Sequence, residues 1–405
     1  MQSRTIPRLA PLVLAAAVLL SACADPVTSA ATAAPGGAPS LTVVPTTAFD
    51  TLDGGRDHAC GLSSTGQAYC WGRNQYGQLG DSTASSTTVP VAVYQPGLAF
   101  DRITAGGAHT CALDSGGQAY CWGHNADSRL GDSTTVLPLM PVAVLPLGGI
   151  SFTQLDAGNA HHCGLDGGGQ AWCWGGNTFG QVGDSTINNT RISPTAVMQG
   201  SLAFTSVSAG TSHTCALDGA GQAYCWGYDG DGALGNGGTV GGRIPQTVQQ
   251  PAGVAFVSIS SNYAHSCALT SGGQAYCWGE NGAGQVGDST VLDRDAPVAV
   301  QQGALSFVSI TTGLDHTCAV DAGGNAYCWG GDGSQQLGNG TGGATRIPGA
   351  VTMPGGVSFA FASVDAAKSC ALDTTGQAWC FGRNNFNQIG DGTSTTRNVP
   401  TAVSH

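Results

Sequence analysis

The chain has 405 residues, of which 64 are glycine; 9% are Asp, Glu, Lys or Arg, and the formal net charge is −12. Lys368 is its one lysine and Glu280 its one glutamate, so coiled coils and helical bundles are excluded, because strong helix formers with charged flanks are missing. The negative charge also argues against a nucleic acid partner, whose phosphates it would repel.

Residues 1–22 predict a signal peptide. Arg4 and Arg8 precede the apolar stretch LAPLVLAAAVLLSA, which is too short for an ordinary membrane-spanning helix. It ends in Leu-Ser-Ala-Cys, which resembles a bacterial lipobox, where the cysteine becomes the mature N-terminus and receives lipid. The alternative is a plain secretory signal with a chance cysteine. We expect lipidation at Cys23 and export to the bacterial cell envelope, periplasmic or surface-exposed, with inner or outer membrane left open.

Residues 23–41 predict a lipidated flexible tether. Small residues and prolines dominate this stretch, and they cannot bury enough apolar area to offset the entropy of ordering. The tether would join the membrane anchor to a folded domain over residues 42–405.

Seven copies of one unit follow the tether. Each copy has two cysteines ten positions apart, and the copies repeat every 51 or 52 residues. The copy at 204–248 reads as four strands, FTSVSAG, HTCAL, AYCWG and IPQTV, separated by glycine-rich turns. Four strands in about 52 residues are the dimensions of a propeller blade, and blades must stack to bury their faces. The sequence therefore predicts an all-β, seven-bladed β-propeller with four-stranded blades; strand periodicity alone leaves a β-solenoid open.

The repeat also resembles a known family. AGGAHTCALDSGGQAYCWGHN and WGRNQYGQLGDST are similar to the repeat of the regulator of chromosome condensation family, over roughly Phe49 to Val403. The resemblance implies a seven-bladed propeller. It also implies two activities known in the family: guanine-nucleotide exchange on a small GTPase, and protein binding by secreted members that inhibit β-lactamases.

The two ends of the repeat region suggest a way to close the ring. Thr42–Val44 stands before the first unit as an apparent spare strand, and Pro400–Val403 lies close to the end of the chain. We expect the C-terminal strand to join the blade that begins near Phe49. Whether Thr42–Val44 also pairs is left open.

The paired cysteines predict one disulfide in each blade. A hairpin centred on residues 64–66 places Cys60 opposite Cys70, where directly opposed side chains come close enough to bridge. Buried free thiols and metal ligation are the alternatives, but zinc prefers Cys-x-x-Cys knuckles with four converging ligands. An exported chain also meets oxidising conditions. The fourteen cysteines are Cys60, Cys70, Cys111, Cys121, Cys163, Cys173, Cys215, Cys225, Cys267, Cys277, Cys318, Cys328, Cys370 and Cys380.

A histidine stands two positions before the first cysteine in six units, and Lys368 takes its place in the seventh. A ring of metal ligands or general bases is one interpretation. Regular repetition favours a structural role instead, with each imidazole hydrogen-bonded within or between blades. The Gly-Asp-Ser-Thr segments favour Asx and Ser/Thr turns over cation binding, and Asp229–Gly232 lacks the glutamate of a calcium loop. The six histidines are His58, His109, His161, His213, His265 and His316.

Positions that differ between units are free to recognise a partner, whereas the shared positions serve folding. Aromatic residues and arginine in the loops after Trp-Gly are typical of interface hot spots; drift on solvated loops is the alternative. The candidate partner-binding residues are Arg73, Tyr76, Phe179, Tyr228, Glu280, Arg383 and Phe386.

The expected function is a membrane-anchored propeller scaffold that binds a protein or a glycan in the cell envelope. The alternative is a regulator similar to a guanine-nucleotide exchange factor, although the even spacings leave no room for an inserted wedge and the chain has an export signal. We expect no enzyme activity, because no Ser/His/Asp trio or carboxylate pair stands outside the repeat register. We also expect no cofactor, no metal and a monomer. The sequence does not show which face binds the partner.

Overall fold

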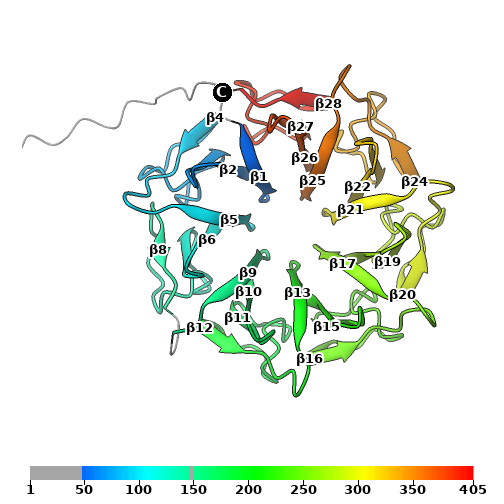
Figure 1. The fold of residues 1–405 in the computed structure, drawn as a ribbon, viewed down its shortest axis with the longest axis horizontal. Helices are drawn as coiled ribbons and strands as arrows, with labels where there is room; N and C mark the ends of the chain where they lie inside the picture. The colour runs from blue at the N-terminus through cyan, green and yellow to red at the C-terminus, as the bar shows by residue number, and fades with distance from the viewer. Residues whose placement is uncertain (1–47, 146–148, 405) are drawn as a thin grey trace, which may run out of the picture. The chain divides into compact units, whose positions relative to one another are not determined.

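A computed structural model describes residues 48–145 and 149–404. Over these ranges the chain forms seven antiparallel sheets, each built from four strands that follow one another in sequence. Figure 1 shows the seven sheets around a common centre. Blade 1 is β1–β4, and so on to blade 7, which is β25–β28. The predicted all-β, seven-bladed propeller with four-stranded blades is confirmed, with a disulfide in every blade.

The blades share one strand order, from the centre outward. The innermost strands are β1 (Phe49–Gly54), β5 (Phe100–Ala105), β9 (Phe152–Ala157), β13 (Phe204–Ala209), β17 (Phe256–Ser261), β21 (Phe307–Thr312) and β25 (Phe359–Asp365). The second strands are β2 (His58–Ser63), β6 (His109–Asp114), β10 (His161–Asp166), β14 (His213–Asp218), β18 (His265–Thr270), β22 (His316–Asp321) and β26 (Lys368–Asp373).

The third and fourth strands complete each sheet. The third strands are β3 (Ala68–Gly72), β7 (Ala119–Gly123), β11 (Ala171–Gly175), β15 (Ala223–Gly227), β19 (Ala275–Gly279), β23 (Ala326–Gly330) and β27 (Ala378–Gly382). The outer strands are β4 (Thr87–Ala92), β8 (Val142–Ala143), β12 (Arg191–Ala196), β16 (Gly242–Thr247), β20 (Arg294–Ala299), β24 (Thr345–Ala350) and β28 (Arg397–Ala402).

The central hairpin of each blade has the register that its cysteines predict. In blade 1, Leu62 lies opposite Ala68 and Cys60 opposite Cys70. The turn closes with a hydrogen bond from the Ser63 N–H to the Gln67 carbonyl oxygen, 3.0 Å. The bonded cysteines have Cα atoms 4.1 or 4.2 Å apart in all seven blades. Each bridge therefore joins the two middle strands of its sheet.

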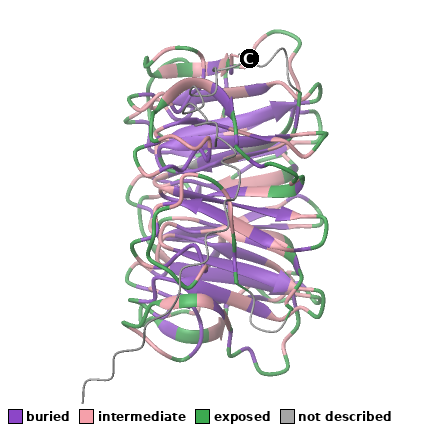
Figure 2. Cartoon of the chain, turned by 90° about the vertical axis from the view of Figure 1, so that its left-hand side faces the viewer, coloured by how far each residue is buried: buried purple, intermediate pink, exposed green. Residues whose placement is uncertain are grey.

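The hydrophobic core lies between neighbouring blades. Trp122 of blade 2 is fully buried against Leu79 and the Cys60–Cys70 bridge of blade 1. Gly80 must be glycine there, because its φ is +69° and a Cβ would lie 2.6 Å from the Trp122 indole nitrogen. Figure 2 shows the resulting pattern, with buried residues in the strands and exposed residues in the loops at both faces. The shared Trp-Gly and Gly-Gln-Leu-Gly motifs thus serve packing between blades.

The predicted closure of the ring by the C-terminal strand is wrong. Strand β28 pairs with β27 of its own blade, with Trp379 opposite Ala402. The corresponding edge in blade 1 is already filled, because β4 pairs with β3. Side chains and backbone groups close the ring instead: the Phe49 N–H donates to the Gly376 carbonyl oxygen, 2.8 Å, and Trp71 packs beside Ile389.

The predicted signal peptide, the tether and Thr42–Val44 lie outside the described residues and stay predictions. In the described ranges, we find no helix of the length and apolarity needed to cross a bilayer.

Candidate functional site: the loop face and its axial cavity

Two sets of connections gather on one face of the propeller. Strands β2 and β3 are antiparallel and pair His58 with Gly72, so the turn before β2 and the loop after β3 leave the blade at the same end. In blade 1, the Arg73 N–H donates to the Asp57 carbonyl oxygen across this end, 2.9 Å. We call this side, with the β1–β2 turns, the β3–β4 loops and their equivalents in the other blades, the loop face. The candidate partner-binding residues from the sequence lie in these β3–β4 loops and their equivalents.

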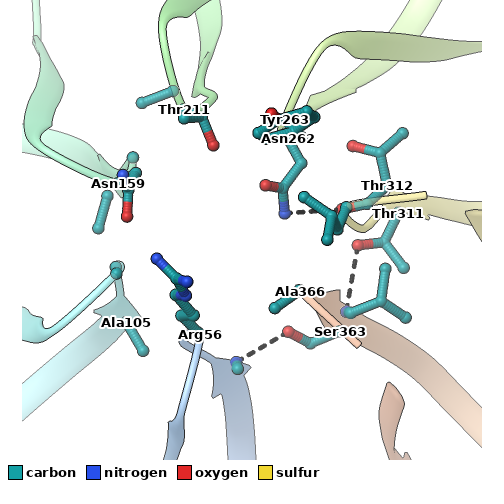
Figure 3. Close-up of a pocket in the computed structure, with 18 of the residues that line it drawn as sticks. Arg56, Ala105, Asn159, Thr211, Asn262, Tyr263, Thr311, Thr312, Ser363 and Ala366 are labelled. Atoms are coloured by element: carbon teal, nitrogen blue, oxygen red, sulfur yellow. Dashed lines mark hydrogen bonds between the residues drawn. The ribbon is translucent and has the colours of Figure 1, made fainter. Parts of the chain in front are cut away.

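A cavity of about 380 Å³ opens at the axis of the propeller on the loop face. The first turn of each blade contributes to its wall, and Figure 3 shows side chains from several blades around it. The Arg56 side chain points into the cavity, with Asn159 and Thr211 among the other wall residues. Tyr263 is 45% exposed at the rim. The wall is therefore mostly polar.

A ring of seven polar side chains forms the throat beneath this cavity. Each of these side chains accepts a hydrogen bond from a backbone N–H of the next blade. The donor is the residue that directly follows that blade's own ring residue on the innermost strand. The Ala105 N–H donates to Asp53 at 2.8 Å, and the Gly54 N–H donates to Ser363 at 3.0 Å, which completes the circle. The seven residues are Asp53, Thr104, Asp156, Ser208, Ser260, Thr311 and Ser363.

Two carboxylates of the throat are shifted toward the neutral form. Burial raises the pKa of Asp156 to about 7, against the hydrogen bond from the Ala209 N–H, which lowers it. Burial also raises the pKa of Asp53, although Ala105 and Ser363 donate hydrogen bonds to it. The throat thus holds two carboxyl groups that ionise less readily than free aspartate.

The sequence analysis did not predict this ring of polar side chains. Seven positions before the first cysteine of each pair the residue is always Asp, Ser or Thr, a regularity that could have identified it. In the sequence these Asp, Ser and Thr residues resemble ordinary polar residues on the surface of a strand. Their role appears only in the structure, because it depends on hydrogen bonds from the backbone of the neighbouring blade.

The structure brings some of the candidate partner-binding residues together in groups. The Arg73 guanidinium lies 4.5 Å and the Arg383 guanidinium 5.3 Å from the centre of the Phe386 ring, a cation–π arrangement that joins the loops of blades 1 and 7. Arg73 also pairs with the Asp57 carboxylate at 2.9 Å.

Aromatic contacts join other neighbouring loops. Phe179 of blade 3 meets Tyr228 of blade 4 edge to face, with ring centres 5.2 Å apart. Tyr76 of blade 1 lies 4.4 Å from the His124 ring of blade 2. Phe179 is 44% exposed, whereas Tyr76, Tyr228 and Phe386 are half-buried. These contacts are consistent with a fixed surface, and partner binding by these residues stays a prediction.

Charge is unevenly spread over the loop face. Glu280 is half-buried, and its pKa is raised by burial and then by the carboxylates of Asp231 and Asp293. The pKa of Tyr228 is raised first by Asp231. Blades 4 and 5 therefore present an acidic pole. Arg73 and Arg383 lie on blades 1 and 7, and Figure 1 shows these two blades on the side of the ring opposite blades 4 and 5.

The repeated histidines join blades, which confirms the predicted structural role for five of the six. Nε2 of His58 lies 2.9 Å from the Thr110 hydroxyl oxygen of blade 2. That hydroxyl donates to the Gln78 carbonyl oxygen of blade 1 at 2.8 Å, so the His58 Nε2–H is the donor. Burial lowers the pKa of His58 to about 3, which keeps the imidazole neutral. The same pairing to Thr or Ser recurs at His161, His213, His265 and His316.

The contact between blades 2 and 3 departs from this pattern. His162 stands where other blades have Thr, Ser or Ala, and its ring lies 4.4 Å from the His109 ring. Both nitrogens of His109 lack a hydrogen-bond partner among the described residues. The sulfurs of Cys111 and Cys121 lie near His162, but they are joined in a disulfide and so are not available as metal ligands.

The Gly-Asp-Ser-Thr segments form turns, as predicted. Asp81 accepts hydrogen bonds from the Thr83 N–H at 3.0 Å and from the Asn74 side-chain amide at 3.0 Å. Asp229 accepts from the Leu234 N–H at 2.9 Å, just as Asn74 accepts from Leu79. Asp229 thus takes the structural place of the asparagine in Trp-Gly-x-Asn.

Two family models with the description "Regulator of chromosome condensation (RCC1) repeat" match the chain. One matches residues 65–113, 168–217, 220–269 and 272–320. The other matches residues 51–78, 100–129, 152–181, 204–233, 256–285 and 307–336.

The chain is similar to curated proteins over part of their length. The Ultraviolet-B receptor UVR8 of Arabidopsis thaliana is 29% identical over 289 residues, 71% of this chain and 66% of UVR8. The E3 ubiquitin-protein ligase HERC2 of Homo sapiens is 29% identical over 273 residues, 66% of this chain and 6% of HERC2. The chain therefore spans slightly less than two thirds of UVR8 and a small part of HERC2.

Solved structures show the same fold. Human WBSCR16 superposes with a TM-score of 0.76 at 19% identity, covering 84% of this chain and 94% of that one. Prp20p of Saccharomyces cerevisiae gives a TM-score of 0.73 at 22% identity, covering 85% and 87%.

Proposed function

Because the chain belongs to the regulator of chromosome condensation (RCC1) repeat family, we propose that it is an exported, lipid-anchored scaffold that binds a protein partner through its loop face. Among its structural neighbours, yeast Prp20 is described bound to Kap60 and binding Gsp1p and histones. These partners are those of Prp20; they support protein binding as the general role.

The observation that supports the loop face most directly is its division into two charged poles. Arg73 and Arg383 cover one aromatic ring on blades 7 and 1, while Asp231, Glu280 and Asp293 repel one another on blades 4 and 5. Complementary charge orients a protein partner and speeds its approach. A partner with an acidic and a basic end would dock in one orientation.

The proposed lipid anchor, the tether and the propeller can act together. Lipid on Cys23 would hold the chain at a membrane, and residues 23–41 would give the propeller reach. The protein would then present a rigid face at some distance from the bilayer and collect its partner there.

The experiment is crosslinking in intact cells that express the tagged full chain, followed by capture of that chain. The test variant changes Tyr76, Phe179 and Phe386 to alanine. The matched control changes Tyr94, Met198 and Val257, which are 51%, 57% and 61% exposed away from the candidate residues. Loss of one protein partner from the test variant alone supports the proposal. Its retention in the test variant, its loss from the control, or capture of a glycan only would contradict it.

A further inference from the structure

We propose that the axial cavity of the loop face binds a carboxylate group, with the Arg56 guanidinium as the counter-ion. This goes beyond the proposed function, because it assigns a ligand chemistry to the cavity whether or not the rim binds a protein. The carboxylate would come from the C-terminus of another chain or from a small free acid.

The first argument is the state of Arg56. Its side chain is exposed and points into the cavity (Figure 3). Within the described ranges no carboxylate lies within ion-pairing distance of it, whereas Arg73, Arg129, Arg191, Arg294 and Arg397 all pair with aspartates. A guanidinium offers a planar fork of donors that matches a carboxylate with two parallel hydrogen bonds. Arg56 therefore has this fork available.

The second argument is the wall around the guanidinium. The Asn159 and Thr211 side chains lie on neighbouring parts of the wall, and Arg383 is also among the residues that line the cavity. These groups can supply further hydrogen bonds and positive charge. The cavity, at about 380 Å³, falls within the range of roughly 300–1,000 Å³ typical of small-ligand sites.

The third argument favours a carboxylate over a phosphate. Asp53 and Asp156 line the lower part of the same cavity, and burial leaves these two carboxyl groups only partly ionised at neutral pH. A phosphate group brings about −1.5 to −2 charges at neutral pH, so the ionised fraction of the two carboxyl groups would oppose it more strongly than it opposes a single charge. A carboxylate brings a single charge, which Arg56 can balance.

The test is isothermal titration of the full chain at low ionic strength. The probe is N-acetyl-trialanine with a free carboxyl end, its amide is the uncharged control, and propionate and inorganic phosphate are titrated alongside. The variant is Arg56→Gln. The matched control is Arg346→Gln, because Arg346 is exposed on the outer strand β24. Melting temperatures confirm that both variants fold.

We expect the free-acid probe to bind, its amide not to bind, and Arg56→Gln to weaken binding at least tenfold while Arg346→Gln leaves it unchanged. Propionate binding as tightly as the peptide would identify a small acid as the source; binding of the peptide alone would identify a chain terminus. The proposal is overturned by no binding of either acid, by equal binding in Arg56→Gln, or by tighter binding of phosphate. None of these outcomes depends on capture of a protein partner.

Discussion

The ammonium group of Lys368 donates a hydrogen bond to the Gly55 carbonyl oxygen across the junction of blades 7 and 1. At five other junctions a histidine in the place of Lys368 forms a hydrogen bond with a Thr or Ser hydroxyl of the next blade. Blade 1 offers Ala59 at that position, which has no hydroxyl. The lysine thus replaces the histidine where the histidine's acceptor is missing.

This exchange predicts coupling between positions 368 and 59. Lys368→His should lower the free energy of unfolding by about 1–3 kcal/mol, because a buried imidazole would face Ala59 without an acceptor. Adding Ala59→Thr should restore most of the loss, since the new hydroxyl would lie near the Gln388 carbonyl oxygen to which Trp71 donates. Urea denaturation of the single and double variants measures the coupling. A double variant no more stable than Lys368→His would refute it.

The junction of blades 1 and 2 predicts a second stability effect. Thr110→Val should cost about 2–4 kcal/mol, because it removes both the acceptor for His58 and the donor to the Gln78 carbonyl oxygen. Thr110→Ser is the matched control, because the Ser369 hydroxyl pairs with His316 and donates to the Gln336 carbonyl oxygen in the same way. Urea denaturation curves measure the free energy of unfolding of both variants. Equal stability of Thr110→Val and Thr110→Ser would contradict a stabilising role for the His58–Thr110 hydrogen bond.

The buried histidines predict loss of stability in acid. Burial lowers the pKa of His58, His161 and His265 to about 3 and that of His213 to about 4, whereas unfolded histidine titrates near 6.5. Folding then favours the neutral form, so its stabilising effect is complete above pH 6.5 and is lost as pH falls toward 3–4. At pH 5 each histidine should cost about 2 kcal/mol relative to pH 7. Denaturation between pH 7 and 5 measures the slope, which a flat profile would contradict.

Asp156 predicts the opposite dependence at higher pH. Burial raises its pKa to about 7, so the folded state favours the protonated acid and loses stability as pH rises from about 4 through 7. Asp156→Asn keeps an acceptor for the Ala209 N–H and cannot ionise. At pH 8 it should be more stable than the natural chain by on the order of 2 kcal/mol, less than the full pKa shift implies, since Asp156 is partly exposed to the axial cavity. The advantage should shrink at pH 5, and an equal difference at both values would count against this explanation.

The lipobox predicts that Cys23 controls attachment to the membrane. Cells fed labelled palmitate should label the natural chain, and Cys23→Ser should remove the label and release the propeller from the membrane fraction. Cys60, which lies in a disulfide, should not be labelled. A labelled Cys23→Ser variant would place the lipid elsewhere and reject the anchor.

The repeat made much of the fold predictable. Cysteines ten positions apart fix the register of the β2–β3 hairpin, and their constant 51–52-residue period fixes the number of blades. Closure was not predictable in the same way, because the local pattern of β28 is the same whether it pairs with β27 or with blade 1. Only the outer strand β4, already in place on β3, decides between them.

The site was less predictable than the fold. Loop residues such as Phe179 and Tyr228 could be named from their variation, but their contact depends on the bend of two separate loops. Arg56 stands two positions before the repeated histidine, where the residue differs from unit to unit. Its position at the axis could not be predicted from the sequence, because the axial cavity forms only when all seven blades are assembled.

The central claim is that shared positions build the ring while the loop face recognises the partner. Amide hydrogen exchange of the full chain, free and bound to the captured partner, tests it most directly. We predict slowed exchange in the β1–β2 turns and β3–β4 loops and their equivalents, strongest near Arg73 and Glu280, with unchanged exchange in the β2–β3 turns. Slowed exchange confined to the β2–β3 turns would contradict the claim.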